Sequence, residues 1–381
     1  MKRARLNVIA VGGIQQYLHF LPAAFELARR GKVSATIFVL SSTEGDAVCA
    51  LAGKLGYAPP DVVIMTPMRA PLGSWMRGKA ATLVWWSRQL RDADALLCAE
   101  RTSSLLAMLP GRCPTFIHIP HGFGDRAVGF ERRIALFDHI LVAGPKDRER
   151  LLALNRVAPE KCHVVGSLKL TAIARMAPIR PKLFANDRPI ILYNPHDNPH
   201  FSSASAAMER LIDLVVADGR YNLIVAPHIK LAHRWGAERC ARIMALRQPD
   251  RVIVDFGSPC LIDMTYTLAT DCYVGDVSSQ VYEFLVRPRP CVFIDAHDAR
   301  WIDNPDYAMW SLGLVVGPEA DLISAIDQAF ADQERYADVQ SARVAQTIGD
   351  NPLAQSRVPV RPDDIDRVAA LLERLILPAD A

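Results

Sequence analysis

The sequence predicts an α/β protein made of two halves, each with a parallel sheet and helices on both of its faces. Short β-branched or aromatic runs alternate with segments of helical period along nearly the whole chain. One segment, residues 172–188, interrupts this alternation with Pro178 and Pro181 and has no clear period, as expected of an interdomain linker. The 381 residues are 50% hydrophobic and 22% charged, which suits two separate hydrophobic cores.

The first half, residues 1–171, contains strand and helix patterns in regular alternation. β-rich runs predict strands at residues 6–11, 33–40, 61–66, 94–99, 115–120 and 163–166, with a helix-to-strand segment at 134–143. Apolar residues at helical spacing predict helices at residues 17–30, 46–55, 101–109 and 146–154. Strands that alternate with helices in this way pair in parallel.

The second half, residues 189–360, repeats the alternation without repeating the sequence. Strands are predicted at residues 190–193, 222–226, 251–255, 271–274 and 291–294, and helices at 208–217, 233–245, 261–267 and 319–330. The C-terminal segment 361–381 holds a long helix, which we expect to pack back on the N-terminal half. Two such halves joined by a linker predict a ligand cleft between them, at the carboxyl ends of the strands.

Net charge, cysteine spacing and the N-terminal stretch bear on the partners and the cellular compartment of the protein. The net charge is only +3, so we expect no nucleic-acid partner. None of the eight Cys forms a CxxC pair, and several lie in apolar runs, which predicts buried free thiols in a reducing cytoplasm. The N-terminal stretch is basic and then apolar, like a secretion signal, but Gly12 and Gly13 interrupt it, so no signal peptide is predicted. No apolar run reaches the ~20 residues that a membrane span needs. We therefore expect a cytoplasmic protein.

The stretch 270–295 is the most informative part of the chain. It predicts a strand, a break at Gly275-Asp276-Val277, a helix capped by Ser278 or Ser279 and ending near residue 286, and a second strand. Free N–H groups and hydroxyls at such a turn can hold a phosphate. The alternative is an ordinary capped strand–helix–strand unit.

Two histidines follow predicted strands. His121 comes directly after the strand 115–120 and before Gly122, whose missing side chain permits close approach. With a reference pKa of ~6.5, a histidine there can accept a proton from an attacking hydroxyl. His228 and Lys230 follow the strand 222–226, where they can bind phosphate or stabilise a leaving group. The alternative for each is a loop residue whose polar groups are satisfied locally.

The loop after residue 193 holds two further candidates, Asn194 and His196. A metal site with His200 is not predicted, because Pro195 and Pro199 stiffen the loop and no third ligand is evident. Residues 68–91 carry five basic side chains, three Trp and no acid before Asp92, which suits an anionic membrane surface. The alternative for this stretch is a helix whose Trp residues pack on the sheet.

Five short motifs occur in the order typical of one enzyme family. They are Ile119-Pro120-His121-Gly122, Ile191-Leu192-Tyr193-Asn194-Pro195-His196, Ala226-Pro227-His228, Gly275-Asp276-Val277-Ser278-Ser279 followed by Tyr282-Glu283, and Gly317-Pro318. With them the chain resembles the CDP-glycerol glycerophosphotransferase family, which includes the teichoic acid polymerases and primases and has a GT-B fold. The chain carries Gly275, Val277 and Glu283 where that family has Thr, Tyr and Asp.

The resemblance implies a role for each candidate. His121 would be the base for the acceptor hydroxyl, and His228 would assist at the donor phosphates. Asp276, Ser278, Ser279, Glu283 and Lys230 would bind the donor, with Ser278 and Ser279 on its diphosphate and Glu283 near its ribose. Gly12, Gly13, Gly122, Asn194 and His196 complete the candidate cleft.

The implied reaction moves glycerol phosphate, or a related polyol phosphate, from a CDP-activated donor to a hydroxyl of a glycan or lipid-linked acceptor of the cell envelope, and releases CMP. It requires no cofactor and no metal, and a lipid-linked acceptor would bring the protein to the inner membrane face. Two alternatives are a GT-B glycosyltransferase with a nucleotide-sugar donor and a nucleotide-binding module without activity.

Overall fold

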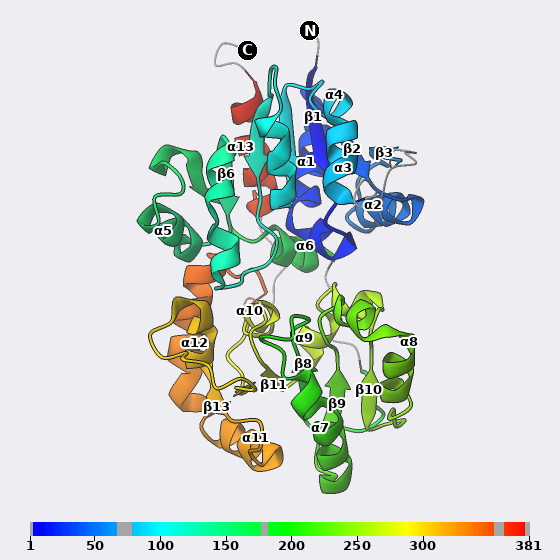
Figure 1. Cartoon of the computed structure of the whole chain (residues 1–381), viewed down its shortest axis with the longest axis vertical. Coiled ribbons are helices and arrows are strands. Elements are labelled where there is room, and N and C mark those ends of the chain that lie inside the picture. Colours follow the sequence, from blue (N-terminus) through cyan, green and yellow to red (C-terminus); the bar gives the residue numbers. More distant parts are fainter. Residues whose placement is uncertain (1–2, 67–77, 177–181, 354–361, 378–381) are drawn as a thin grey trace. The chain divides into compact units, whose positions relative to one another are not determined.

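The first sheet of the computed structural model is parallel and doubly wound (Figure 1). The structure describes residues 3–66, 78–176, 182–353 and 362–377. Within them the sheet has seven strands in the order β3-β2-β1-β4-β5-β6-β7. These are β1 (Ala4–Ile9), β2 (Val33–Val39), β3 (Asp61–Ile64), β4 (Ala95–Cys98), β5 (Thr115–His118), β6 (His139–Val142) and β7 (Cys162–Val164).

The second sheet has six strands in its described part, in the order β10-β9-β8-β11-β12-β13. They are β8 (Ile190–Asn194), β9 (Asn222–Val225), β10 (Val252–Val254), β11 (Cys272–Gly275), β12 (Cys291–Ile294) and β13 (Leu314–Val316). In each sheet the order reverses beside the first strand, between β1 and β4 and between β8 and β11. The predicted α/β class with two doubly wound parallel sheets is confirmed.

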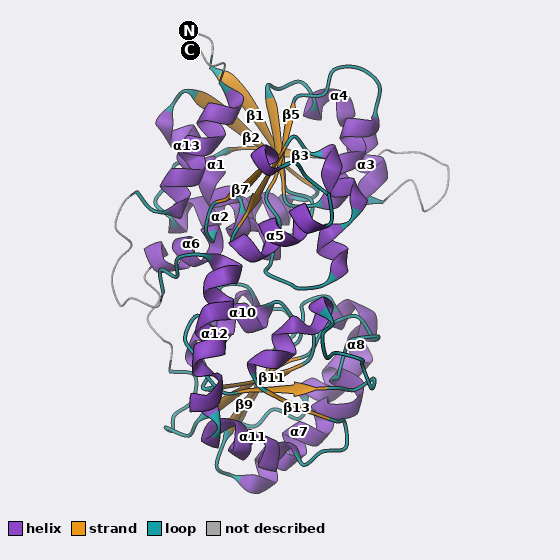
Figure 2. Cartoon of the chain, turned by 90° about the vertical axis from the view of Figure 1, so that its left-hand side faces the viewer, coloured by secondary structure: helices purple, strands orange, loops and turns teal. Residues whose placement is uncertain are grey.

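Helices cover both faces of each sheet (Figure 2). The α-helices around the first sheet are α1 (Leu21–Arg30), α2 (Ser42–Lys54), α3 (Lys79–Trp85), α4 (Ser87–Leu90), α5 (Pro145–Ala153), α6 (Leu168–Met176) and α13 (Asp364–Ile376). Those of the second half are α7 (Ala204–Asp218), α8 (Leu231–Met244), α9 (Thr265–Ala269), α10 (Gln280–Phe284), α11 (Leu322–Ala331) and α12 (Gln333–Ile348). The apolar residues of α7 and α11 pack in one cluster with β8, β9 and β12. The predicted burial of Cys98, Cys272 and Cys291 is confirmed.

The structure differs from the predicted elements in several places. Helix α6 lies where residues 172–176 were taken as linker, because nearly all of its residues are buried and it therefore shows no polar face. The strand β13 and the polar helix α12 were not predicted. The helix predicted at residues 101–109 is present as the 3-10 helix Arg101–Met108. The helix after Ser279 ends at Phe284, so it is too short for a strong macrodipole.

By contacts the chain divides into two compact units that are not linear in sequence. The first unit contains Met1–Gly122, Val128–Ala177 and Ala345–Ala381, and the second contains Phe123–Ala127 and Pro178–Val344. The short segment Phe123–Ala127 therefore leaves the first unit directly after His121-Gly122 and packs within the second. Helix α13, as part of the first unit, packs along α1 and α6.

Candidate functional site

The strand order places one candidate site at the carboxyl ends of β8 and β11. Asn194 at the end of β8 is in register with Gly275 at the end of β11, so the loops that follow these strands are neighbours. A doubly wound sheet binds ligands at this edge, where the strand order reverses. Both the His196 loop and the Ser278-Ser279 turn begin here, as the sequence predicted.

Asp276 holds these two loops together. Its carboxylate accepts hydrogen bonds from the backbone N–H of His196 (2.9 Å) and Ser203 (2.7 Å), from the Ser203 hydroxyl (2.9 Å) and from the N–H of Val277 (2.8 Å). The side chain is fully buried, and burial raises its pKa to about 6 in spite of these bonds. Asp276 was predicted to touch the donor. In this structure the carboxylate is buried and its hydrogen bonds hold the two loops, so contact with a donor stays a prediction.

The two serines differ in exposure. The Ser278 hydroxyl is buried and donates to Asn194 Oδ1 at 2.9 Å, while Asn194 Nδ2 donates to the Ala226 carbonyl at 2.6 Å. Ser279 is half-buried, and within the described residues its side chain makes no capping bond to α10. Ser279 is therefore the more accessible of the two hydroxyls, and Ser278 and Asn194 shape the turn. Glu283 is also buried, and its approach to a donor ribose stays a prediction.

His228 lies beside a carboxylate that the sequence analysis missed. Its Nδ1 is 3.3 Å from Asp197 Oδ1, and Arg234 Nε is 3.1 Å from Asp197 Oδ2. Burial alone would raise the pKa of Asp197, but His228, His196 and Arg234 outweigh it and lower the pKa below its usual value. The backbone N–H of Lys230 lies 3.2 Å from His228 Nδ1, and the Lys230 side chain is exposed. This loop places His228 and Lys230 beside His196, whose ring centroid is 5.6 Å from that of His228.

His196 is buried and neutral. Its Nδ1 accepts from the N–H of Asn198 at 2.8 Å, so the proton of the neutral ring is on Nε2. Burial, followed by the positive charge of Arg126, lowers its pKa to about 3. His196 can thus donate a hydrogen bond but cannot act as a base through Nδ1.

His121 lies in the first unit, after β5. The ring is exposed, and Nδ1 is 2.9 Å from the Ala99 carbonyl oxygen, an acceptor that requires the proton on Nδ1. Nε2 is then the basic nitrogen of the neutral ring. Gly122 has a φ of 80°, a left-handed conformation that favours glycine, and its N–H lies 3.5 Å from Nδ1 of His19. Burial, with Lys169 and His121 nearby, holds the pKa of His19 well below its usual value.

Gly12 and Gly13 follow β1, at the point where the first sheet reverses its order. A Cβ on Gly12 would lie only 1.7 Å from Gln16 Oε1, so this glycine gives the Gln16 side chain its place. Gln16 Nε2 in turn donates to Glu100 Oε1 at 2.9 Å, after β4. The first unit therefore has a polar edge of its own. A ligand shared between the two units stays a prediction.

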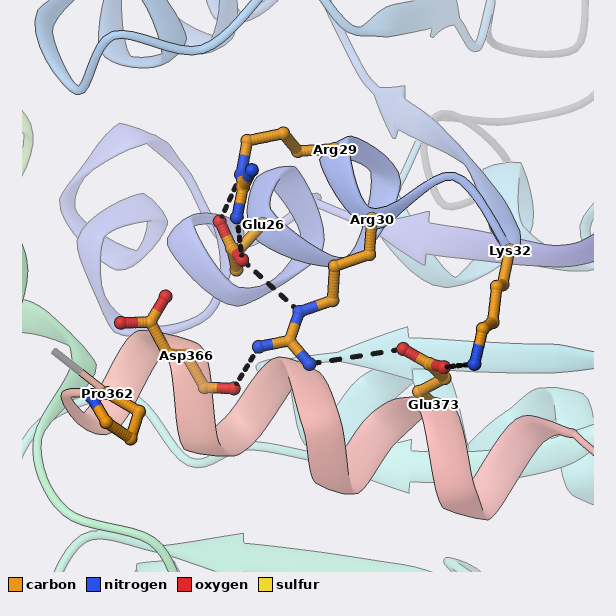
Figure 3. Close-up of a pocket in the computed structure, with 7 residues that line it drawn as sticks. All are labelled: Glu26, Arg29, Arg30, Lys32, Pro362, Asp366 and Glu373. Carbon is orange, nitrogen blue, oxygen red and sulfur yellow. Dashed lines mark hydrogen bonds and ion pairs between the residues drawn. The ribbon is translucent and has the colours of Figure 1, made fainter.

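A charged pocket in the first unit was not predicted (Figure 3). It is lined by Glu26, Arg29, Arg30, Lys32, Pro362, Asp366 and Glu373. Arg29 and Arg30 pair with Glu26, and Lys32 Nζ is 2.7 Å from Glu373. Arg30 also donates to the Asp366 carbonyl at 2.6 Å. Each of these cations has an acidic partner, and the pairs with Glu373 connect the α1 region to α13.

The stretch proposed for membrane contact is only partly described, since residues 67–77, with Arg69, Trp75 and Arg77, lie outside the described residues. Trp86 packs against the first core and its indole N–H donates to the Thr66 carbonyl at 3.0 Å, whereas Trp85 is 58% exposed. Lys79 is 3.5 Å from Glu100. In the described parts of the chain, no helix is long and apolar enough to cross a membrane.

Comparison with known proteins shows which solved structures share this fold. No protein-family model and no functionally curated protein matches the sequence. A putative UDP-N-acetylglucosamine 2-epimerase from Listeria monocytogenes superposes with a TM-score of 0.67 over 98% of this chain and 96% of its own, at 14% identity. The chain has a GT-B-like fold.

Two further solved structures have the same fold. The UDP-GlcNAc 2-epimerase from Neisseria meningitidis, bound to UDP-GlcNAc, has a TM-score of 0.65 at 14% identity over 97% of this chain and 100% of its own. The wall teichoic acid polymerase TagF, soaked with CDPG, has a TM-score of 0.60 at 12% identity over 97% of this chain and 88% of its own. At such low identity the likeness establishes the GT-B-like architecture, and the choice of donor and reaction belongs to the proposal below.

Proposed function

We propose that this protein is a transferase that moves glycerol phosphate, or a related polyol phosphate, from a CDP-activated donor to a hydroxyl of a glycan or lipid-linked acceptor. The observation that carries the proposal is the edge of the second sheet. There Asp276 holds the Ser278-Ser279 turn against the loop of His196, and His228 lies beside that loop. An accessible hydroxyl, histidines and Lys230 at the point of strand reversal suit a diphosphate.

The chemistry follows from these groups. The acceptor oxygen attacks the donor's β-phosphorus, and its proton passes to Nε2 of His121, which the Ala99 carbonyl keeps in the required tautomer. The bond between the β-phosphorus and the bridging oxygen breaks, and CMP leaves with that oxygen. Ser279, His228 and Lys230 stabilise the negative charge that develops on the phosphates. The proposed reaction uses only these side chains and the two substrates.

The chain connection after His121 supports these roles for His121 as the base and for the second unit as the donor-binding part. His121 lies four residues before Asp125 in the sequence, and Asp125 packs within the second unit, against α10. In the sequence, the proposed base is thus only four residues from Asp125, a residue of the second unit. The TagF structure soaked with CDPG, which shares the fold, is a further reason to choose a CDP-activated donor.

A GT-B glycosyltransferase with a nucleotide-sugar donor is the second candidate. It is favoured by the UDP-GlcNAc 2-epimerases, which match with TM-scores of 0.67 and 0.65 against 0.60 for TagF. In a glycosyltransferase of this kind the bond at the sugar's anomeric carbon breaks, and a nucleoside diphosphate leaves.

Donor screening followed by product analysis tests the proposal. Thermal shift with CDP-glycerol, UDP-GlcNAc and related nucleotides identifies the donor, since a ligand that binds only the native state raises its stability. Incubation of the bound donor with candidate acceptors should release CMP, and His121→Ala should abolish this release. A nucleoside diphosphate as product would favour the glycosyltransferase. Binding without turnover, unchanged in His121→Ala, would instead identify an inactive nucleotide-binding module.

A further inference from the structure

The segment Phe123–Ala127 runs along the predicted donor site. It follows His121-Gly122 in sequence, yet its contacts lie within the second unit. At one end, a Cβ placed on Gly124 would be 3.6 Å from the Cβ of Ser279. Next to it, the buried Asp125 accepts a hydrogen bond from the Tyr282 hydroxyl of α10. Two consecutive residues are thus fixed against the turn and helix that carry Ser279.

A second contact reinforces this anchor. Arg343 of α12 donates from one guanidinium nitrogen to Asp125 Oδ1 (3.3 Å) and from another to the Tyr282 hydroxyl (3.4 Å). The Asp125 side chain is 2% exposed, and these hydrogen bonds satisfy its buried carboxylate oxygens. Asp125, Tyr282 and Arg343 come from three distant parts of the sequence, and together they fix the position of the residue that follows, Arg126.

Arg126 points toward the His196 loop. Its guanidinium lies over the Phe201 ring, 5.3 Å from the centroid, and Phe201 contacts the His196 ring edge-to-face at 6.0 Å. The Arg126 charge is also the largest electrostatic influence that lowers the pKa of His196. Arg126, the Nε2–H of His196, and the exposed Lys230 beyond His228 thus bring positive charge and a donor to one place. Two carboxylates lie beside them: Asp197, which is paired with His228 and Arg234, and the buried Asp276, which accepts from the backbone N–H of His196.

We propose that Arg126 is a donor-binding residue, held by the Asp125–Tyr282–Arg343 anchor so that its guanidinium meets the diphosphate of the nucleotide donor beside His196 and Ser279. The inference rests on the proposed function for its ligand, a nucleoside diphosphate group. A guanidinium is suited to this task because it binds phosphate oxygens in a bidentate way and lies flat on an aromatic ring. Asp125 and Tyr282 are positioning residues that act through Arg126.

Calorimetric titration of the full chain with inorganic diphosphate, CDP and UDP tests the proposal. Arg126→Ala should weaken binding of these probes by about tenfold or more, because a hydrogen bond to a charged group is lost. Arg126→Lys should retain part of the affinity. Arg242→Ala, which removes an exposed arginine paired with Glu209, is the matched control and should bind like the parent. Tyr282→Phe keeps the Arg126 charge but removes the hydroxyl that bonds to Asp125. It should weaken binding of the same probes by a smaller factor, about two to five.

The outcomes separate the two proposals. If Arg126→Ala binds CDP and UDP like the parent, the role of Arg126 is overturned while the transferase proposal stands. If Arg126 governs diphosphate binding but no donor is turned over, Arg126 is retained as a binding residue and the transferase proposal fails. If the parent binds none of the three probes, both are overturned. Equal unfolding temperatures of parent and Arg126→Ala exclude loss of folding as the cause.

Discussion

Two buried polar networks, one in each unit, are built from opposite kinds of partner. In the first unit Arg175 of α6 donates to both oxygens of Asp363 (2.7 and 2.5 Å) and to Asp366 (2.9 Å) at the start of α13. In the second unit Asp276 accepts only from backbone N–H groups and the Ser203 hydroxyl. The first network balances charge with charge, and the second surrounds one charge with neutral donors.

The difference shows in the pKa values of the carboxylates and in what each network holds. Burial raises the pKa of Asp363, but Arg175 outweighs it and the pKa falls below its usual value. The pKa of Asp276 instead rises to about 6, because neutral donors do not offset the loss of water. The Arg175 network joins two helices 188 residues apart, whereas the Asp276 network joins loops at the predicted site. We therefore expect damage to the first network to lower stability directly, and damage to the second to change both the pH dependence of stability and the geometry of the loops at the predicted site.

The largest effect is expected for Arg175→Ala. It would leave two buried carboxylates without their charged partner, which costs about 3–5 kcal/mol of the free energy of unfolding. Urea denaturation measures the loss, and hydrogen exchange should show it first in α13. Arg242→Ala, at an exposed ion pair, is the control and should change little. An unfolding curve for Arg175→Ala that matches this control would contradict the role of the network.

Asp276→Asn tests the second network through pH. The folded pKa of about 6 lies above the ordinary 3.8, so the folded state binds the proton more tightly than the unfolded state. The parent should thus be most stable, relative to the variant, below pH ~4, and lose about 3 kcal/mol of this difference as the pH rises to ~6. Urea unfolding of both proteins between pH 4 and 7 measures it. A difference that does not change with pH would mean that Asp276 titrates normally.

The two serines should separate binding from stability. Ser279→Ala should weaken binding of CDP by about tenfold, through the loss of one hydrogen bond to phosphate, with the unfolding temperature unchanged. Ser278→Ala should remove the hydrogen bond that the serine hydroxyl donates to Asn194 Oδ1, and should lower the free energy of unfolding by about 1–3 kcal/mol. Calorimetry and thermal unfolding of both variants measure the two effects. If neither variant changes CDP affinity, the turn is an ordinary connection between strand and helix.

The smallest effect concerns the predicted membrane surface. Trp85 is exposed and Arg88 lies on the next helix, so Trp85→Ser with Arg88→Glu should reduce co-sedimentation with anionic liposomes a few-fold at low salt. Salt should weaken parental binding, because exposed charges are screened over ~10 Å at 0.1 M. Trp86→Phe is the control, since Trp86 packs on the core. Parental protein that stays in the supernatant at low salt would remove the membrane from the proposal.

The sequence alone was sufficient for the alternation of strands and helices, the two sheets and the ends of strands that carry His121, His228 and Ser279. These features depend on local hydrophobic period and on turn residues such as Gly122, which neighbouring positions reveal. Because the prediction depends on this period, the sequence analysis missed α6 and α12. One is buried nearly all round and the other is polar, so neither shows a clear amphipathic period.

Only the tertiary structure decided which candidates are exposed and what each contacts. Asp276 reaches His196 across 80 residues of sequence, and Arg343 reaches Asp125 across 218, so no local pattern contains either contact. Ser278 and Ser279 are adjacent and chemically identical, yet packing buries one hydroxyl against Asn194 and leaves the other accessible. Burial and long-range partners are properties of the folded core, and they determine which polar groups hold the loops and which can bind a ligand.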